Sequence, residues 1–81
     1  MNETEKLFRK INKKDRLALR EDISLLLLGK HKSINIKKLQ GSDFSRLRKG
    51  KFRIIFHYKE SGEVIIDAVR IKGEDTYKDF I

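Results

Sequence analysis

The sequence predicts an α+β domain, spanning residues 1–81, in which an N-terminal helical hairpin (1–29) packs on a small antiparallel sheet of three to four strands (33–81). Apolar residues recur at helical spacing in the first part of the chain. The second part holds short apolar runs separated by turn signals such as Gly50 and Ser61-Gly62. Helices followed by a run of strands are typical of the α+β class.

A first helix is expected to begin at a cap formed by Asn2 or Thr4 and to end at the polar break of residues 12–14. Its apolar side chains share one face: Leu7, Phe8 and Ile11. Asp15 is the predicted N-cap of a second helix, which ends just before Gly29. The apolar stripe of this helix follows the same spacing: Leu19, Ile23, Leu26 and Leu27.

Three segments of strand are predicted after the helices. Residues 33–39 alternate, with Ile34 and Ile36 between polar positions, and residues 40–43 form a turn. Residues 45–58 form a hairpin around Gly50. Residues 64–71 are nearly continuous in valine and isoleucine, so we expect a central strand covered on both faces. A polar tail with an aromatic end, residues 72–81, follows.

Composition limits the classes of function. The net charge of +8 over 81 residues points to a polyanionic partner, nucleic acid or acidic protein, with a merely solvating lysine surface as the alternative. The absence of cysteine excludes disulfides and thiolate metal sites, and two isolated histidines form no metal constellation, so neither metal nor cofactor is expected. No apolar run approaches the roughly 20 residues of a membrane span, and no signal peptide is evident, so a cytoplasmic protein without a membrane partner is expected.

Five cations and no acid occupy the eight positions from 46 to 53. They are the predicted RNA-binding residues: Arg46, Arg48, Lys49, Lys51 and Arg53. Because strand side chains alternate, Arg46 and Arg48 share one face, and Arg53 shares a face with His57. If these faces coincide, three guanidinium groups meet on one surface and suit a phosphate-rich ligand. The alternatives are a solvated sheet edge for Arg46 and Arg48, and an ion pair between Arg53 and Asp67.

Residues 37–78 carry an ordered set of motifs: a Lys-Leu-x-Gly turn, an Arg-Leu-Arg strand, a glycine, an aromatic-Arg pair, an apolar strand, a Val/Ile strand ending in Arg-Ile, and a tyrosine. This set resembles the RelE/ParE toxin superfamily. The resemblance implies the toxin of a type II toxin–antitoxin module with a cognate antitoxin as partner. RelE-like members are endoribonucleases that cut mRNA on the ribosome, whereas ParE-like members poison gyrase. The N-terminal strand usual in the family is lacking, so an uncovered sheet edge, or a strand from a partner, is expected.

By position, the resemblance assigns site roles to Arg46, Arg48, Arg53 and Tyr77. Metal-independent RNA cleavage needs deprotonation of the 2′-hydroxyl, stabilisation of the phosphate oxygens and protonation of the leaving oxygen. We predict five catalytic residues: Arg48 and Arg53 on the phosphate, Tyr77 stacking a base or steering the nucleophile, and Lys72 or Glu74 assisting proton transfer. Lys51 and His57 are further candidates for the proton. The alternatives are a ParE-like or catalytically weak member acting by protein binding, and an RNA-binding domain without chemistry.

Overall fold

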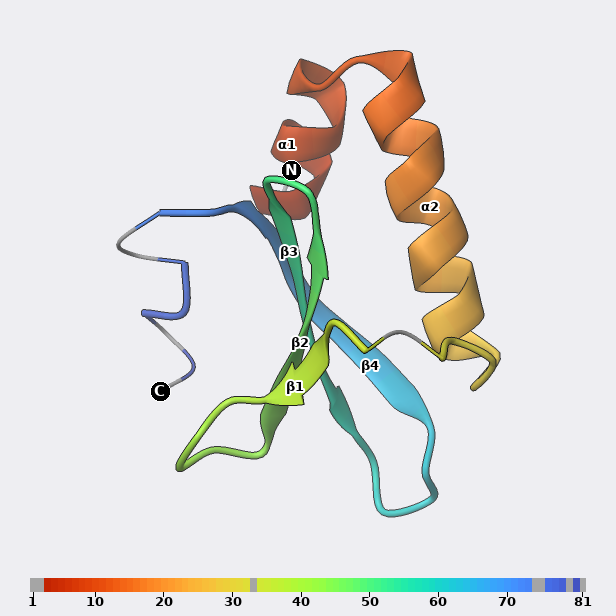
Figure 1. The fold of residues 1–81 in the computed structure, drawn as a ribbon, viewed down its shortest axis with the longest axis vertical. Helices are drawn as coiled ribbons and strands as arrows, with labels where there is room; N and C mark the ends of the chain where they lie inside the picture. The colour runs from red at the N-terminus through yellow and green to blue at the C-terminus, as the bar shows by residue number, and fades with distance from the viewer. Residues whose placement is uncertain (1–2, 33, 74–75, 79, 81) are drawn as a thin grey trace.

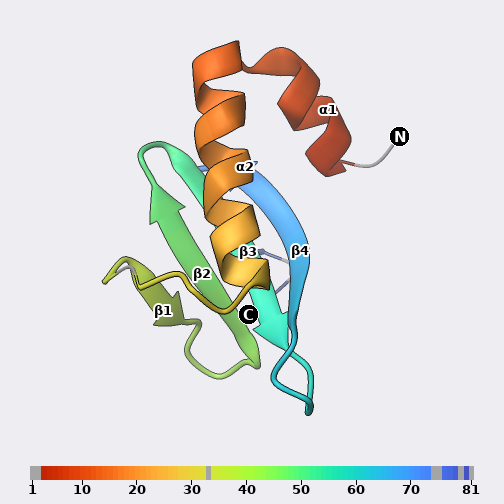
Figure 2. The same cartoon turned by 90° about the vertical axis from the view of Figure 1, so that its right-hand side faces the viewer.

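The computed structural model describes residues 3–32, 34–73, 76–78 and 80. Two helices, α1 (Glu3–Lys10) and α2 (Lys13–Leu27), precede four strands, β1 (Ile36–Lys38), β2 (Phe44–Lys49), β3 (Phe52–Tyr58) and β4 (Val64–Ile71). The strands form one antiparallel sheet in the order β1-β2-β3-β4. Helix α2 crosses one face of this sheet, and the C-terminal segment lies on the opposite side (Figures 1 and 2). The predicted α+β class, with two helices before an antiparallel sheet, is confirmed.

The ends of α2 are fixed by local hydrogen bonds. Asn12 is its N-cap, because its backbone is extended and its side chain accepts a hydrogen bond from the Asp15 N–H at 2.8 Å. The prediction of Asp15 as the cap is therefore wrong. The Asp15 carboxylate lies in the first turn, where its negative charge interacts favourably with the positive end of the helix dipole. Gly29 follows the helix as predicted, with a φ of 69° that suits glycine. Among the described residues, no helix is both long and apolar enough to cross a bilayer.

The core lies between α2 and the sheet. It is built from fully or nearly buried side chains: Leu19, Leu26, Leu47, Phe52, Ile54, Phe56, Val64 and Val69. The predicted stripe of α2 holds except at Leu27, which is 53% exposed. At about 100° per residue, Leu27 is turned about 80° away from Leu19, beyond the edge of the buried stripe. The core thus covers only one face of the sheet and leaves the other for different contacts.

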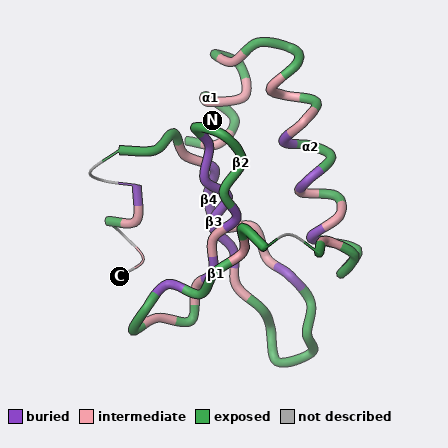
Figure 3. The backbone as a smooth tube through the Cα atoms, in the orientation of Figure 1, coloured by how far each residue is buried: buried purple, intermediate pink, exposed green. Residues whose placement is uncertain are grey.

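The order of the strands differs from the prediction. The interior strands are β2 and β3, each of which pairs with a neighbour on both sides, whereas β4, predicted to be central, ends the sheet. Figure 3 shows β3 as a largely buried segment, and its residues 52–56 are all buried. The first strand is also shorter than expected, since only Ile36–Lys38 pair with β2, and Ile34 is 92% exposed. β4 is covered by contacts with α1 and α2, and Ile71 at its end is 49% exposed.

Candidate functional site

Three arginines stand side by side on neighbouring strands. In the sheet register, Arg48 of β2 lies opposite Arg53 of β3, and Arg53 lies opposite Arg70 of β4. We call these three residues the arginine row. Residues directly opposite in an antiparallel pair point to the same face, and Arg46, two positions from Arg48, points there too. The face of Arg46 and Arg48 and the face of Arg53, whose coincidence the sequence left as a condition, are therefore the same face.

Hydrogen bonds to carbonyl groups hold two of these arginines in place. Arg53 is 6% exposed, and its Nη1 donates to the carbonyls of Gly50 and Phe52, both at 2.8 Å. Arg46 Nη1 donates to the carbonyl of Asn35. Neutral carbonyls orient a guanidinium group but do not neutralise it. The positive charge on this face is therefore held in position and is not neutralised by these bonds.

Ion pairing on this face is sparse. Among the described residues, no carboxylate lies within ion-pair distance of Arg46, Arg48 or Arg53. Arg70 differs, because its Nε donates to Glu3 Oε1 at 2.8 Å and its Nη1 to the carbonyl of Thr76 at 3.0 Å. The expected alternative for Arg53, an ion pair with Asp67, is wrong.

Asp67 instead bonds to His57, with 2.7 Å between Asp67 Oδ2 and His57 Nδ1. A β-bulge creates this contact: Ile55 pairs with Ala68 and Phe56 with Ile66, so Asp67 is the extra residue. His57 is four residues along β3 from Arg53, a separation of about 13 Å. A phosphate held at the arginine row is therefore out of reach of this imidazole.

The C-terminal segment covers the middle of the face that carries the arginine row. The Phe80 ring packs edge-on against Phe44, with 4.8 Å between ring centroids, and the Arg70 guanidinium carbon lies 5.0 Å from the centre of the Phe80 ring. Cover on this side explains why Ile55 is fully buried and Ala68 is 6% exposed although both point away from α2. The face that carries the arginine row is thus a basic surface partly covered by the C-terminal segment, and Arg48 belongs to its exposed part.

The remaining predicted residues are not all brought to this face. Lys49 lies on the α2 side, where its Nζ is 3.5 Å from Asp22 Oδ2. The Lys51 ammonium lies 5.4 Å from the centre of the Phe52 ring, which belongs to the core. Lys72 is exposed just beyond β4.

The last two predicted residues belong to the C-terminal segment. Tyr77 is half-buried there, and its hydroxyl bonds to no described residue. Glu74 falls outside the described residues. The assignments of proton transfer to Lys72 or Glu74, and of a steering role to Tyr77, therefore stay predictions.

Arg70 is the member of the row that the sequence interpretation missed as a site residue. Alternation along β4 predicts from the sequence that Ala68 and Arg70 share one face of the strand. Without the register, however, nothing in the sequence says that Arg70 faces Arg53. Pairing across strands, and not spacing along the chain, assembles the row.

The described residues contain no group of three or more His, Asp or Glu side chains that could hold a metal ion. Comparison with protein-family models, with curated proteins and with solved structures finds no match to this chain. The functional interpretation therefore rests on the geometry of the arginine-row face and on the resemblance noted in the sequence.

Proposed function

We propose that this protein is the toxin of a type II toxin–antitoxin module and acts as a RelE-like, metal-independent endoribonuclease that cuts mRNA on the ribosome. The observation that carries the proposal is the arginine row, whose members lie on three adjacent strands of one sheet face. Neighbouring strands are about 4.8 Å apart, so their guanidinium groups can act together on one phosphodiester backbone.

The energetics of the row favour an anionic ligand. Like charges directly opposite on adjacent strands destabilise a sheet, by up to about 1 kcal/mol for a pair. Arg48 and Arg53 form such a pair, and no carboxylate among the described residues lies close enough to offset their repulsion. A phosphate that accepts hydrogen bonds from both guanidinium groups would remove the repulsion and satisfy their remaining N–H donors.

In the proposed reaction, Arg48 and Arg53 stabilise the negative charge that develops on the phosphate. The 2′-oxygen attacks phosphorus and gives up its proton, while the 5′-oxygen leaves and gains one. Tyr77 steers the nucleophile or stacks on a base, and Lys72 or Glu74 assists proton transfer. Tyr77 belongs to the C-terminal segment and Lys72 precedes it, and this segment lies on the same side of the sheet as the row.

The alternative is a ParE-like gyrase inhibitor, or a catalytically weak relative that acts by binding a protein. One observation favours it: His57, the histidine on this face, lies four residues, about 13 Å of backbone, along β3 from Arg53, and its imidazole is bonded to Asp67, so it is not placed to serve as a base beside Arg53. A basic face without a nearby base binds polyanions or acidic proteins as well as RNA.

Expression from an inducible promoter tests the proposal. The wild-type chain should arrest growth and produce cut transcripts, and Arg48→Gln should relieve both, since Arg48 is exposed and its loss leaves the fold intact. Arg20→Gln, which removes one exposed arginine from α2, is the matched control and should arrest growth normally. Growth arrest with intact mRNA and gyrase-dependent DNA breaks would support the alternative. A chain that causes no arrest would contradict both.

A further inference from the structure

His57 and Asp67 form a side-chain pair on the face that carries the arginine row, at the other end of β3 from Arg53. His57 Nδ1 lies 2.7 Å from Asp67 Oδ2. Because an ionised carboxylate only accepts hydrogen bonds, Nδ1 is the donor and holds the proton of the neutral ring. The other ring nitrogen, Nε2, is then an acceptor, and it has no partner among the described residues. The imidazole is thus held in the tautomer that takes up a proton at Nε2.

The pair is accessible, and its geometry comes from the β-bulge in β4. The His57 side chain is 33% exposed, so a ligand can reach its ring. Asp67 is the extra residue of the bulge, and bulges beside active sites re-aim a side chain. A histidine oriented by a carboxylate is the arrangement of a general base, because the carboxylate fixes the ring and stabilises the imidazolium that forms.

A basic path leads from the arginine row to this pair along β2. Alternate residues of a strand share one face and are about 6.6 Å apart, so Arg48, Arg46 and Phe44 form three successive positions. Lys37 of β1 lies opposite Arg46 and is exposed, with no ion pair to a described residue. His57 lies opposite Phe44. Cations therefore occupy the first two positions and the imidazole the third.

The third position also offers an aromatic surface. The rings of Phe44 and His57 meet edge to face, with 5.7 Å between their centroids, and Phe44 is only half-buried. Aromatic rings beside a basic groove hold the bases of single-stranded RNA by stacking. A nucleotide at this position would have its base near Phe44 and its ribose near His57.

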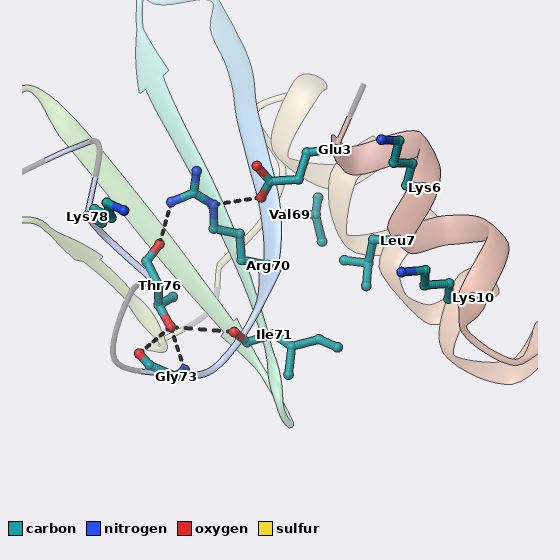
Figure 4. Close-up of a pocket in the computed structure, with 10 residues that line it drawn as sticks. All are labelled: Glu3, Lys6, Leu7, Lys10, Val69, Arg70, Ile71, Gly73, Thr76 and Lys78. Atoms are coloured by element: carbon teal, nitrogen blue, oxygen red, sulfur yellow. Dashed lines mark hydrogen bonds and ion pairs between the residues drawn. The ribbon is translucent and has the colours of Figure 1, made fainter. Parts of the chain in front are cut away.

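The β4 end of the arginine row is already occupied by contacts within the chain. Figure 4 shows Arg70 between Glu3 and Thr76, and its guanidinium group donates to the Glu3 carboxylate at 2.8 Å and to the Thr76 carbonyl at 3.0 Å. The Phe80 ring lies over the same group, with its centre 5.0 Å from the guanidinium carbon. A single strand of RNA is therefore placed along β2 and β3 and not along β4.

We propose that His57 is the catalytic residue, and Asp67 its positioning residue, of a second RNA-cleaving centre on the strand that the arginine row holds. The inference rests on the proposed function for the binding of RNA, but it does not require the ribosome. A phosphate at Arg53 and a ribose at His57 belong to different nucleotides of one strand, because the two residues are about 13 Å apart along β3.

The step is an internal transfer at one phosphodiester. His57 Nε2 takes the proton of a 2′-hydroxyl, and the 2′-oxygen forms a bond to the adjacent phosphorus. The bond from phosphorus to the 5′-oxygen breaks, and that oxygen leaves with a proton from water. The remaining hydroxide takes the proton from the imidazolium, so the ring is restored and the products are a 2′,3′-cyclic phosphate and a 5′-hydroxyl. Arg46, diagonal to His57 across the two strands, provides positive charge for the phosphate oxygens.

The first test concerns the tautomer and needs no RNA. In the full chain with ¹⁵N-labelled histidine, the shifts of the ring nitrogens should place the proton of the neutral His57 ring on Nδ1. His31 is the internal reference, because its Nε2 lies 3.0 Å from Asp22 Oδ1 and should carry the proton instead. Asp67→Asn should raise the fraction of the His57 ring protonated on Nε2, since an amide both donates and accepts. A neutral His57 ring protonated on Nε2 in the wild type would overturn the proposal.

The second test is cleavage of a short, free single-stranded RNA of mixed sequence by the purified chain without ribosomes. The wild type should produce fragments that end in 2′,3′-cyclic phosphate. His57→Gln should cut about 100-fold more slowly or worse, with unchanged affinity for the RNA. His31→Gln is the matched control, because it removes the other histidine that is bonded to an aspartate, and it should cut like the wild type.

Two further variants separate proton transfer from a structural role. Imidazole added to the solution should restore part of the cleavage by His57→Ala, because the free base can act in the space that the side chain leaves. Asp67→Asn should lose about tenfold or more in rate without a loss of RNA affinity. Amide spectra of each variant confirm that it is folded before its rate is compared.

Equal rates in the wild type and His57→Gln would overturn the proposal, as would a loss in His57→Gln that weaker RNA binding explains in full, or a His57→Ala variant that imidazole does not rescue. The two proposals also fail separately. A wild type that causes no growth arrest contradicts the toxin, whereas a wild type that arrests growth and leaves free RNA intact contradicts the His57 centre alone.

Discussion

Arg48 and Arg53 lie directly opposite each other on β2 and β3, yet Arg48 is exposed and Arg53 is 6% exposed. Two carbonyls accept hydrogen bonds from the Arg53 guanidinium, that of Gly50 in the hairpin turn and that of Phe52 at the start of β3. Arg53 is therefore both a buried support for the turn and a fixed charge, whereas Arg48 is a free contact. Substitutions at the two positions should separate binding from stability.

Arg48→Gln should weaken RNA binding while leaving the fold as stable as before or slightly more stable. In a plot of the logarithm of the affinity for a single-stranded oligonucleotide against the logarithm of the salt concentration, the slope should become less steep by about 0.7, the contribution of one phosphate contact. Removal of the repulsion with Arg53 should raise the free energy of unfolding by up to about 1 kcal/mol. Arg20→Gln serves as the control, and an unchanged salt slope in Arg48→Gln would contradict the assigned contact.

Arg53→Lys should destabilise the protein although it keeps the charge. The lysine side chain is one bond shorter than that of arginine, so its ammonium group does not reach the position from which Arg53 Nη1 donates to the Gly50 and Phe52 carbonyls. A lost hydrogen bond from a charged group costs about 1.5–3 kcal/mol. Urea denaturation should show this loss, whereas Arg48→Lys should stay within about 0.5 kcal/mol of the wild type. Equal effects at the two positions would mean that the turn does not depend on Arg53.

Asn12→Ala should lower the free energy of unfolding by about 1 kcal/mol, because the Asp15 N–H loses its acceptor at the start of α2. Asn12→Ser should restore most of that loss, since serine is also a good cap. Thermal and urea unfolding can measure both. A larger loss in Asp15→Ala than in Asn12→Ala would instead place the cap at Asp15.

Gly50→Ala should cost about 1 kcal/mol through the backbone alone. Gly50 has a φ of 56°, and an added Cβ meets nothing within 4 Å, so no steric clash contributes. Gly73→Ala is the comparison, because Gly73 has no positive φ and a Cβ there meets only the Ile71 carbonyl at 4.0 Å. Denaturation curves measure the free energy of unfolding of both variants. An equal loss in Gly50→Ala and Gly73→Ala would show that a side chain at position 50 does not strain the turn.

Much of the fold follows from local patterns. The apolar stripe on α2 and the glycine after it depend on spacing and backbone chemistry within a few residues, and the structure reproduces both. The helix cap was misplaced because Asn12 and Asp15 are equally good capping residues, and only the extended backbone at Asn12 selects between them. Alternation along β3 also places Ile54 and Phe56 on the face opposite Arg53, and both are buried in the core.

The sequence by itself determined that Arg46 and Arg48 would share one face of a basic strand, since alternation along a strand is a local property. Only the tertiary structure decided that Arg53 and Arg70 join this face, that Lys49 turns to Asp22, and that β4 is an edge strand. These relations depend on register and strand order, which arise from contacts between residues far apart in the chain. Hydrophobic pattern limits such contacts but does not specify them.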